Sequence, residues 1–174
     1  NTDSLVLNNV QQSASYTVAY TLGDTTSRAV YDVNVYESNT LADGYYYFLN
    51  QTDGSYLTND GTNNPLFTKR NPDSENARIW YIKKDSTTDR YAVYNCDKGG
   101  RFLNENGRFS TVAFNPTNHT FNLLNPVGTN LFAFKNGGDV GSHHWIINSS
   151  LITGKGSIAL KGYPFMLMPA NPLL

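Results

Sequence analysis

Apolar and polar residues alternate with a period of two along much of the chain, which is the pattern of β-strands with one buried face. The first examples are residues 15–20 (Ser-Tyr-Thr-Val-Ala-Tyr) and 30–36 (Val-Tyr-Asp-Val-Asn-Val-Tyr), with Gly23-Asp24 between them. No segment has the spacing of an amphipathic helix over three turns. The pattern predicts two strands before residue 44, paired as a hairpin.

From Gly44 onward, short apolar segments alternate with turn signals at the spacing of many short strands, and three of these segments look alike. Each copy reads strand, Asn, turn, aromatic–aliphatic pair, polar spacer and Gly. The copies begin at Gly44, Arg90 and Thr120, and their pairs are Tyr56-Leu57, Phe102-Leu103 and Leu131-Phe132. A strand with Trp80 ends the first copy and one with Trp145 ends the third, while Val112-Ala113-Phe114 stands at the comparable place in the second.

A repeated hairpin has a physical rationale, because one hairpin alone is marginally stable in water. Three hairpins can close a barrel, which removes the exposed sheet edges. The sequence therefore predicts an all-β barrel with Trp80 and Trp145 in one core. Residues 156–168 read as final strands, one of which is expected to pair with residues 5–10 or 44–50.

The repeated pattern of strand, Asn, Gly turn, Tyr/Phe-Leu and Trp resembles a β-trefoil of the ricin-B-like kind, as found in modules of secreted bacterial proteins. The resemblance covers about residues 44–147 and implies three hairpin repeats about a pseudo-threefold axis. Two features depart from it. The copies are unevenly spaced, with 46 positions from Tyr56 to Phe102 and 29 from Phe102 to Leu131, and the Gln-x-Trp signature of ricin-like lectins is absent.

These patterns divide the chain into two parts. Residues 44–174 are expected to form the β-trefoil domain. Residues 1–43 have no place in a minimal trefoil, so they are interpreted either as an added β-hairpin or as the end of a preceding β-domain. The chain begins at Asn1 without Met, which is expected of an excerpt or of a chain that has lost its leader.

Composition narrows the function classes. Charged residues make up 16% of the chain and the net charge is -1, so no basic excess is available to neutralise phosphates, and nucleic acid is not an expected partner. No apolar run is long enough for a membrane span. Cys96 is the single cysteine, which excludes an intramolecular disulfide.

The residues that usually carry catalysis form no convincing set. The acidic residues stand mostly at turns, where Asp side chains bond their own backbone. His143 and His144 are adjacent and would point to opposite faces of a strand, so they cannot share a metal ion there. No nucleophile elbow or phosphate-binding loop is present. No catalytic residue, metal or cofactor is expected.

Binding remains, because the loops of each copy offer what a carbohydrate site needs: carboxylates and amides for hydroxyl groups, and aromatic rings for stacking. The candidate ligand-binding residues are Asp53, Tyr56, Asn59, Asp60, Asp97, Asn104, Asn106, Asn136, Asp139 and His143. For Tyr56, Phe102 and Leu131, which take equivalent places in the copies, a core position is the competing interpretation. Tyr45, Tyr47 and Tyr81 are alternative stacking residues.

The sequence thus suggests a non-catalytic, secreted or cell-surface carbohydrate-binding module of a larger protein. The alternative is a protein-binding trefoil, either a hydrolase inhibitor or an adhesion and assembly module, since a fold alone does not choose between them. An enzyme ranks last.

Overall fold

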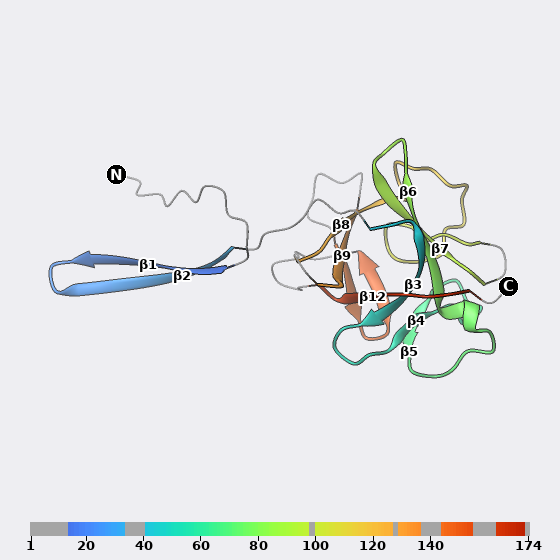
Figure 1. The fold of residues 1–174 in the computed structure, drawn as a ribbon, viewed down its shortest axis with the longest axis horizontal. Coiled ribbons are helices and arrows are strands. Elements are labelled where there is room, and N and C mark those ends of the chain that lie inside the picture. Colours follow the sequence, from blue (N-terminus) through green and yellow to red (C-terminus); the bar gives the residue numbers. More distant parts are fainter. Residues whose placement is uncertain are drawn as a thin grey trace.

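The computed structural model describes residues 14–33, 41–97, 100–126, 129–136, 144–154 and 163–172. These residues form a two-stranded sheet and a 10-stranded sheet. Figure 1 shows the two-stranded sheet as a long hairpin and the larger sheet as a rounded body. Within the described residues, no helix is long and apolar enough to span a bilayer.

The hairpin consists of β1 (Ala14–Leu22) and β2 (Thr25–Val33), which pair antiparallel along their whole length. The two-residue turn is Gly23-Asp24, where Gly23 has a φ of 59°. A positive φ at the first turn position suits glycine and matches the twist of the strands. The predicted hairpin is confirmed, although β1 runs further and β2 begins earlier than expected; residues 34–36 lie outside the described residues.

The larger sheet contains a closed ring of six antiparallel strands. In ring order they are β3 (Gly44–Asn50), β6 (Ile79–Asp85), β7 (Arg90–Asn95), β8 (Phe121–Leu124), β9 (Leu131–Asn136) and β12 (Phe165–Pro169). The ring closes because β12 pairs with β9 on one side and with β3 on the other, for example through Leu167 and Phe48. This confirms the predicted barrel and the return of the chain's tail to residues 44–50.

Three short hairpins lie outside this ring. They are β4 (Tyr56–Thr58) with β5 (Leu66–Thr68), the bridge between Leu103 and Phe109, and β10 (Trp145–Asn148) with β11 (Leu151–Gly154). The hairpins join one another: Leu151 pairs with Leu66, and the Phe109 amide donates to the Asn63 carbonyl at 3.2 Å. The 3-10 helix η1 (Glu75–Arg78) precedes β6.

The structure corrects the third copy of the sequence repeat. A ring strand pairs with the start of a short hairpin three times, through Leu49 with Tyr56, Tyr94 with Phe102, and Lys135 with His144. His144, not Leu131, is therefore the counterpart of Phe102, and the distance between them is 42 positions rather than 29. Trp145 accordingly takes the place of Leu57 and Leu103, whereas Trp80 lies on a ring strand.

Trp80 and Trp145 nevertheless share one core, as the sequence predicts. Both are fully buried in a single apolar cluster. Phe48 contacts the Trp80 ring with a centroid distance of 6.2 Å, and Phe134 stacks on Trp145 at 4.9 Å. Each indole N–H donates to a backbone carbonyl at 2.9 Å, from Trp80 to Leu57 and from Trp145 to Glu105. Both Trp polar atoms are thus satisfied inside the barrel.

Candidate functional site

Several of the predicted ligand residues hold the turns in which they stand. The Oδ1 of Asn59 accepts the Gly61 amide at 3.0 Å, and the Oδ1 of Asn104 accepts the Asn106 amide at 2.9 Å. These are Asx turns at matching places in two hairpins. Asn59 also donates from Nδ2 to Oδ1 of Asn95 at 3.1 Å, and both side chains are buried. Both polar atoms of the Asn59 side chain therefore bond within the protein and stabilise the fold.

The carboxylates of Asp53 and Asp60 each accept hydrogen bonds through only one oxygen. Oδ1 of Asp53 accepts the amide and the hydroxyl of Ser55 at 2.8 and 2.6 Å, and these bonds hold the pKa of Asp53 below its usual value. Oδ1 of Asp60 accepts the amide and the hydroxyl of Thr62 at 3.0 and 2.7 Å. Each carboxylate presents its second oxygen without a hydrogen bond from the described residues.

Asp60 lines a surface hollow of about 320 Å³, here called hollow 1. Its lining includes the polar residues Asp60, Arg70, Asn71, Asp73 and Asp97. Asn59 also lines it. The structure therefore brings together three residues that the sequence assigned to two different copies. A hollow of this size lies at the lower end of the range for small-ligand sites.

Two further hollows occupy related places. Hollow 2, of about 310 Å³, is lined by Asn104, Glu105, Ser110 and His119, among others. Hollow 3, of about 390 Å³, has a lining that includes Asp53 and Ser149. Each hollow lies beside the turn of a short hairpin. The lining of hollow 1 also includes Asp97, which follows ring strand β7. The lining of hollow 3 includes Asp53, which follows ring strand β3.

His119 in hollow 2 is buried, and its surroundings favour the neutral ring. Its Nδ1 accepts the Asn115 amide at 2.9 Å, and burial lowers its pKa. Because Nδ1 is an acceptor, the neutral ring carries its proton on Nε2, which lies 3.4 Å from Oγ of Ser110. A general base must accept the proton of its nucleophile. Here Nε2 carries a proton and faces the Ser110 hydroxyl as a donor, so the pair is not arranged as a serine–histidine dyad.

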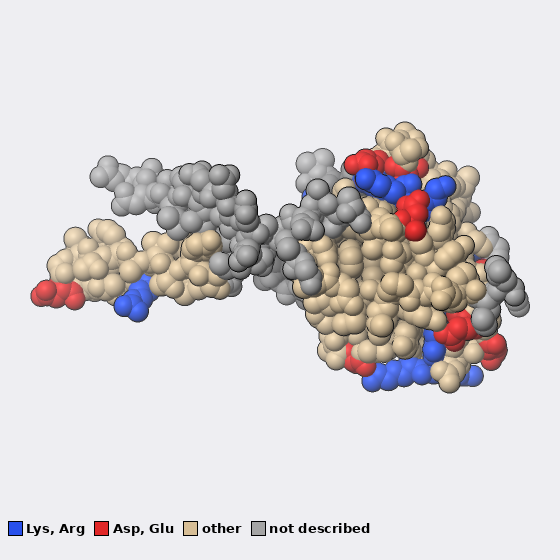
Figure 2. Space-filling model, in the orientation of Figure 1, with Lys and Arg blue, Asp and Glu red and all other residues tan. Residues whose placement is uncertain are grey.

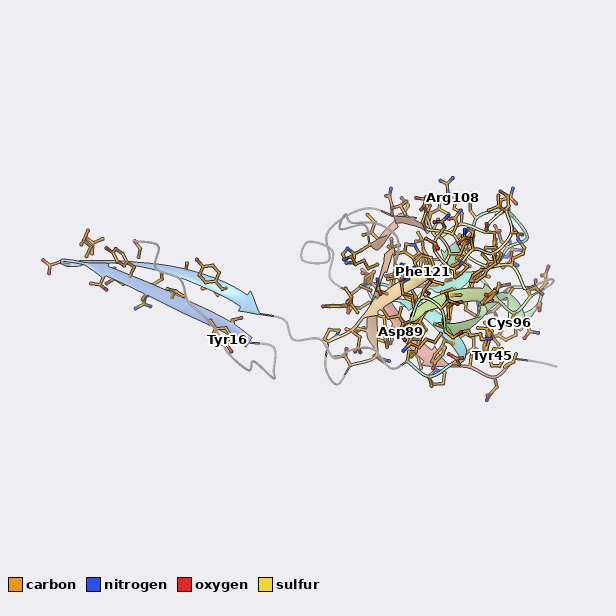
Figure 3. All side chains as sticks on the ribbon, turned by 90° about the horizontal axis from the view of Figure 1, so that it is seen from above. Tyr16, Tyr45, Asp89, Cys96, Arg108 and Phe121 are labelled. Atoms are coloured by element: carbon orange, nitrogen blue, oxygen red, sulfur yellow. The ribbon has the colours of Figure 1, made fainter. Side chains whose placement is uncertain are left out.

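The aromatic candidates lie apart from the hollows. Tyr56 packs edge-on against Tyr47 at a centroid distance of 5.6 Å and lies under the guanidinium of Arg78 at 4.9 Å. It lines none of the three hollows. Tyr45 and Tyr81 form a tilted pair at 4.9 Å on the outside of the barrel, with Tyr45 41% exposed; Figure 3 labels Tyr45 near the margin of the barrel.

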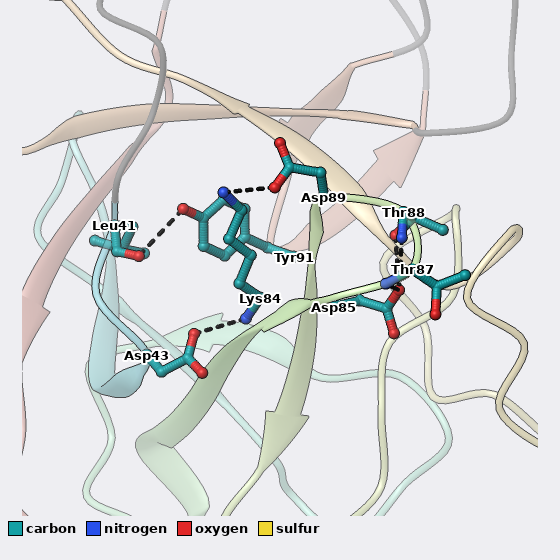
Figure 4. Close-up of polar contacts among 8 residues, drawn as sticks. All are labelled: Leu41, Asp43, Lys84, Asp85, Thr87, Thr88, Asp89 and Tyr91. Atoms are coloured by element: carbon teal, nitrogen blue, oxygen red, sulfur yellow. Dashed lines mark hydrogen bonds and ion pairs between the residues drawn. The ribbon is translucent and has the colours of Figure 1, made fainter.

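Charged side chains on the face shown in Figure 2 gather at opposite margins of the barrel and leave an uncharged expanse between them. Figure 4 shows one margin, where Lys84 pairs with Asp89 at 2.7 Å. Asp43 accepts the Lys84 amide at 2.7 Å, and Oδ1 of Asp85 accepts the amides of Thr87 and Thr88. These contacts connect the β6–β7 hairpin to the residues before β3. The charged residues of this cluster therefore have structural partners.

The remaining predicted residues are not brought into a hollow. Asn106 lies in its turn outside the three linings. Asn136 ends β9, but its side chain is not described, and Asp139 and His143 lie outside the described residues. Within the described ranges, no three His, Cys, Asp or Glu side chains are grouped as metal ligands.

Sequence reasoning missed Arg70, Asn71 and Asp73, which line hollow 1. They belong to the segment between β5 and η1, which has no counterpart in the repeated pattern. The available signal was the polar run from Lys69 to Asp73. Such a run indicates an exposed loop, but its position opposite Asp97 depends on the closure of the barrel.

No protein-family model matches the chain, and no curated protein matches it in sequence. Solved structures with a similar fold include a GlcNAcα1-4Gal-releasing endo-β-galactosidase from Clostridium perfringens, with a TM-score of 0.60 and 14% identity, over 73% of this chain and 32% of that one. A mosquitocidal holotoxin gives a TM-score of 0.62 and 16% identity, over 76% of this chain and 18% of that one. The chain spans about a third or less of either protein, and at these identities the likeness is one of fold.

Proposed function

We propose that the barrel is a β-trefoil and acts as a non-catalytic carbohydrate-binding module of a larger secreted or cell-surface protein. Hollow 1 carries this proposal. Its lining includes Asp60 and Asp97, whose carboxylates can accept hydrogen bonds, and Arg70 and Asn71, whose side chains can donate them. Sugar hydroxyls both donate and accept hydrogen bonds, so a rim with both kinds of group suits them.

The fold supports the proposal in two ways. Three ring strands each lead into a short hairpin, which is the arrangement expected of trefoil repeats. A similar fold also occurs within a longer galactosidase chain, of which this chain covers 32%. The proposal concerns binding alone, because a rigid scaffold with open loops needs no catalytic group to hold a sugar.

A glycan array probed with the 174-residue chain tests the function, followed by titration calorimetry with any sugar that binds. In the double variant Asp60→Asn and Asp97→Asn, we expect binding about tenfold weaker or worse, because charged acceptors become neutral ones. The change Asp60→Asn keeps an Oδ1 acceptor for the Thr62 turn. Asp24→Asn in the hairpin turn is the matched control and should bind as the parent does.

A silent array would contradict carbohydrate binding. Equal affinity of the double variant and the control would place the sugar elsewhere and overturn hollow 1 as the site. In that case the Tyr45–Tyr81 pair is the alternative sugar site, because exposed aromatic rings can stack on the apolar faces of sugars. Tyr45→Ala would then weaken binding.

A protein-binding trefoil is the second candidate, favoured by one observation. Tyr45 and Met168 are 41% and 43% exposed on adjacent strands of the barrel's outer surface. Tyr and Met are enriched at protein interfaces. Capture of a hydrolase or surface protein that free sugars do not compete away, and that the change Met168→Lys abolishes, would favour this function.

A further inference from the structure

Strand β1 has the composition of an interface strand rather than of a protected edge. Its sequence, Ala-Ser-Tyr-Thr-Val-Ala-Tyr-Thr-Leu, contains no charged residue, proline or glycine. The even positions, which include Tyr16, Val18, Tyr20 and Leu22, share one face of the hairpin because side chains alternate along a strand. The odd positions carry Ser, Thr and Ala. One face is therefore apolar and the other mostly polar.

None of the described side chains of the hairpin is buried. Tyr20, Leu22 and Tyr31 are 59%, 71% and 57% exposed. Figures 1 and 3 both show the hairpin standing clear of the barrel. A two-stranded hairpin in water is marginally stable, and three or more strands are normally needed for independent stability.

The turn fixes which backbone groups of β1 point outward. In a hairpin with a two-residue turn, the flanking residues Leu22 and Thr25 exchange both hydrogen bonds, and bonded pairs recur at every second position. The even residues of β1 therefore bond to β2. The N–H and C=O groups of odd residues such as Thr17, Ala19 and Thr21 point away from β2 along the outer edge.

We propose that this edge pairs antiparallel with β1 of a second copy of the chain, about a twofold axis at Val18. This register bonds Thr17 to Ala19 of the second copy on one side of the axis, and Ala19 to Thr17 of the second copy on the other. Val18 meets its own counterpart at the axis. Tyr16 meets Tyr20 of the second copy, an aromatic cross-strand pair that occurs twice.

Composition favours β1 over β2 as the pairing edge. Two β1 strands bring no charges together, so self-pairing meets no repulsion. The outer edge of β2 carries Arg28 and Asp32, and charged residues are a common protection of an exposed edge. The equivalent register about Val30 would set Arg28 opposite Asp32 of a second copy, so the variants at Val30 test β2 as the alternative edge. Pairing through β1 gives the four-stranded order β2–β1–β1–β2, which exceeds the number needed for stability and leaves only the charged strands at its edges.

The interface consists of one strand from each copy, so it is small and the expected dissociation constant is in the range of about 1–50 µM. Sedimentation velocity of the 174-residue chain up to about 500 µM, well above that range, should show a concentration-dependent dimer. Ala19→Pro removes an outward N–H and should abolish the dimer. Val30→Pro, the matched change on the outer edge of β2, should leave the dimer intact.

A disulfide test fixes the register. Opposed residues of a non-hydrogen-bonded pair lie about 4.5 Å apart at Cα, within disulfide range. In a Cys96→Ser background, Val18→Cys should cross-link rapidly and Val30→Cys slowly. A monomer at every concentration overturns the proposal and assigns the apolar face to another occupant. Equal cross-linking rates, or a dimer lost in Val30→Pro instead of Ala19→Pro, overturn the β1 interface.

Discussion

Asn59 donates from its side-chain amide to Oδ1 of Asn95 at 3.1 Å, and the amide of Asn95 donates to the carbonyls of Ala77 and Ile79. Two buried side chains thus connect a short hairpin, η1 and two ring strands beneath hollow 1. Asn95→Asp would place carboxylate oxygens against two carbonyl oxygens. We expect a loss of about 1–3 kcal/mol in the free energy of unfolding, measured by urea denaturation.

Asn104→Ala is the comparison for this pair, because Asn104 lies at the place of Asn59 but its Oδ1 bonds only within its own turn and the following residues. It should cost less than Asn95→Asp. Equal losses from both changes would show that the Asn59–Asn95 link has no special role.

The Trp145 indole donates to the Glu105 carbonyl across two hairpins. Trp145→Phe removes this donor and leaves both an unpaired carbonyl and a small void. We expect about 1–3 kcal/mol of destabilisation in urea. Tyr20→Phe, an exposed aromatic change in β1, should leave the unfolding free energy of the barrel unchanged.

Gly154, which pairs directly with Trp145 across the hairpin, lies against the same carbonyl. A Cβ built at Gly154 would lie 2.6 Å from the Glu105 oxygen, a contact with backbone that a side-chain rotation cannot relieve. Gly154→Ala should therefore lower the melting temperature by several degrees, as a loss of about 1 kcal/mol or more would. A melting temperature equal to that of the parent would contradict this close approach.

Ser149 has a φ of 56° in the two-residue turn between β10 and β11. This left-handed conformation is unfavourable for serine and free of strain for glycine. Ser149→Gly should raise the melting temperature slightly, with a gain of up to about 1 kcal/mol. Ser150→Gly, one position further and outside the left-handed region, should give no gain.

The buried His119 predicts a pH dependence of stability. Its folded-state pKa is lowered by burial, so the unfolded state binds a proton more readily. The contribution of neutral His119 to the free energy of unfolding is fully present above the unfolded-state pKa of about 6.5. It is lost as the pH falls from there toward the folded-state pKa. Urea midpoints at about pH 8 and about pH 5 should differ more in the parent than in His119→Gln. An equal difference in both proteins would exclude His119 as the cause.

Local signals in the sequence were sufficient for the hairpin. The period of two in residues 15–20 and 30–36 predicts two strands with a turn between them, and Gly23 provides the positive φ that the turn needs, although the start of β2 at Thr25 was not apparent from alternation. The all-β class and the shared tryptophan core could also be predicted, because alternation and the burial of large aromatics depend little on which strands become neighbours.

The third repeat could not be assigned from local pattern. Leu131-Phe132 resembles the aromatic–aliphatic pair of a short hairpin, but it begins β9, a ring strand between β8 and β12. Short apolar runs look alike in either role. Only long-range pairing distinguishes them, and that pairing depends on the closure of the ring.

By itself, the sequence determined the all-β class, the N-terminal hairpin and the residue types available at the loops, because these follow from alternation and turn chemistry over a few residues. The tertiary structure alone decided that Asn59 is buried against Asn95 and that Asp60 and Asp97 line one hollow. Those residues are more than 35 positions apart, and a closed barrel sets their distance through the packing of all its strands at once.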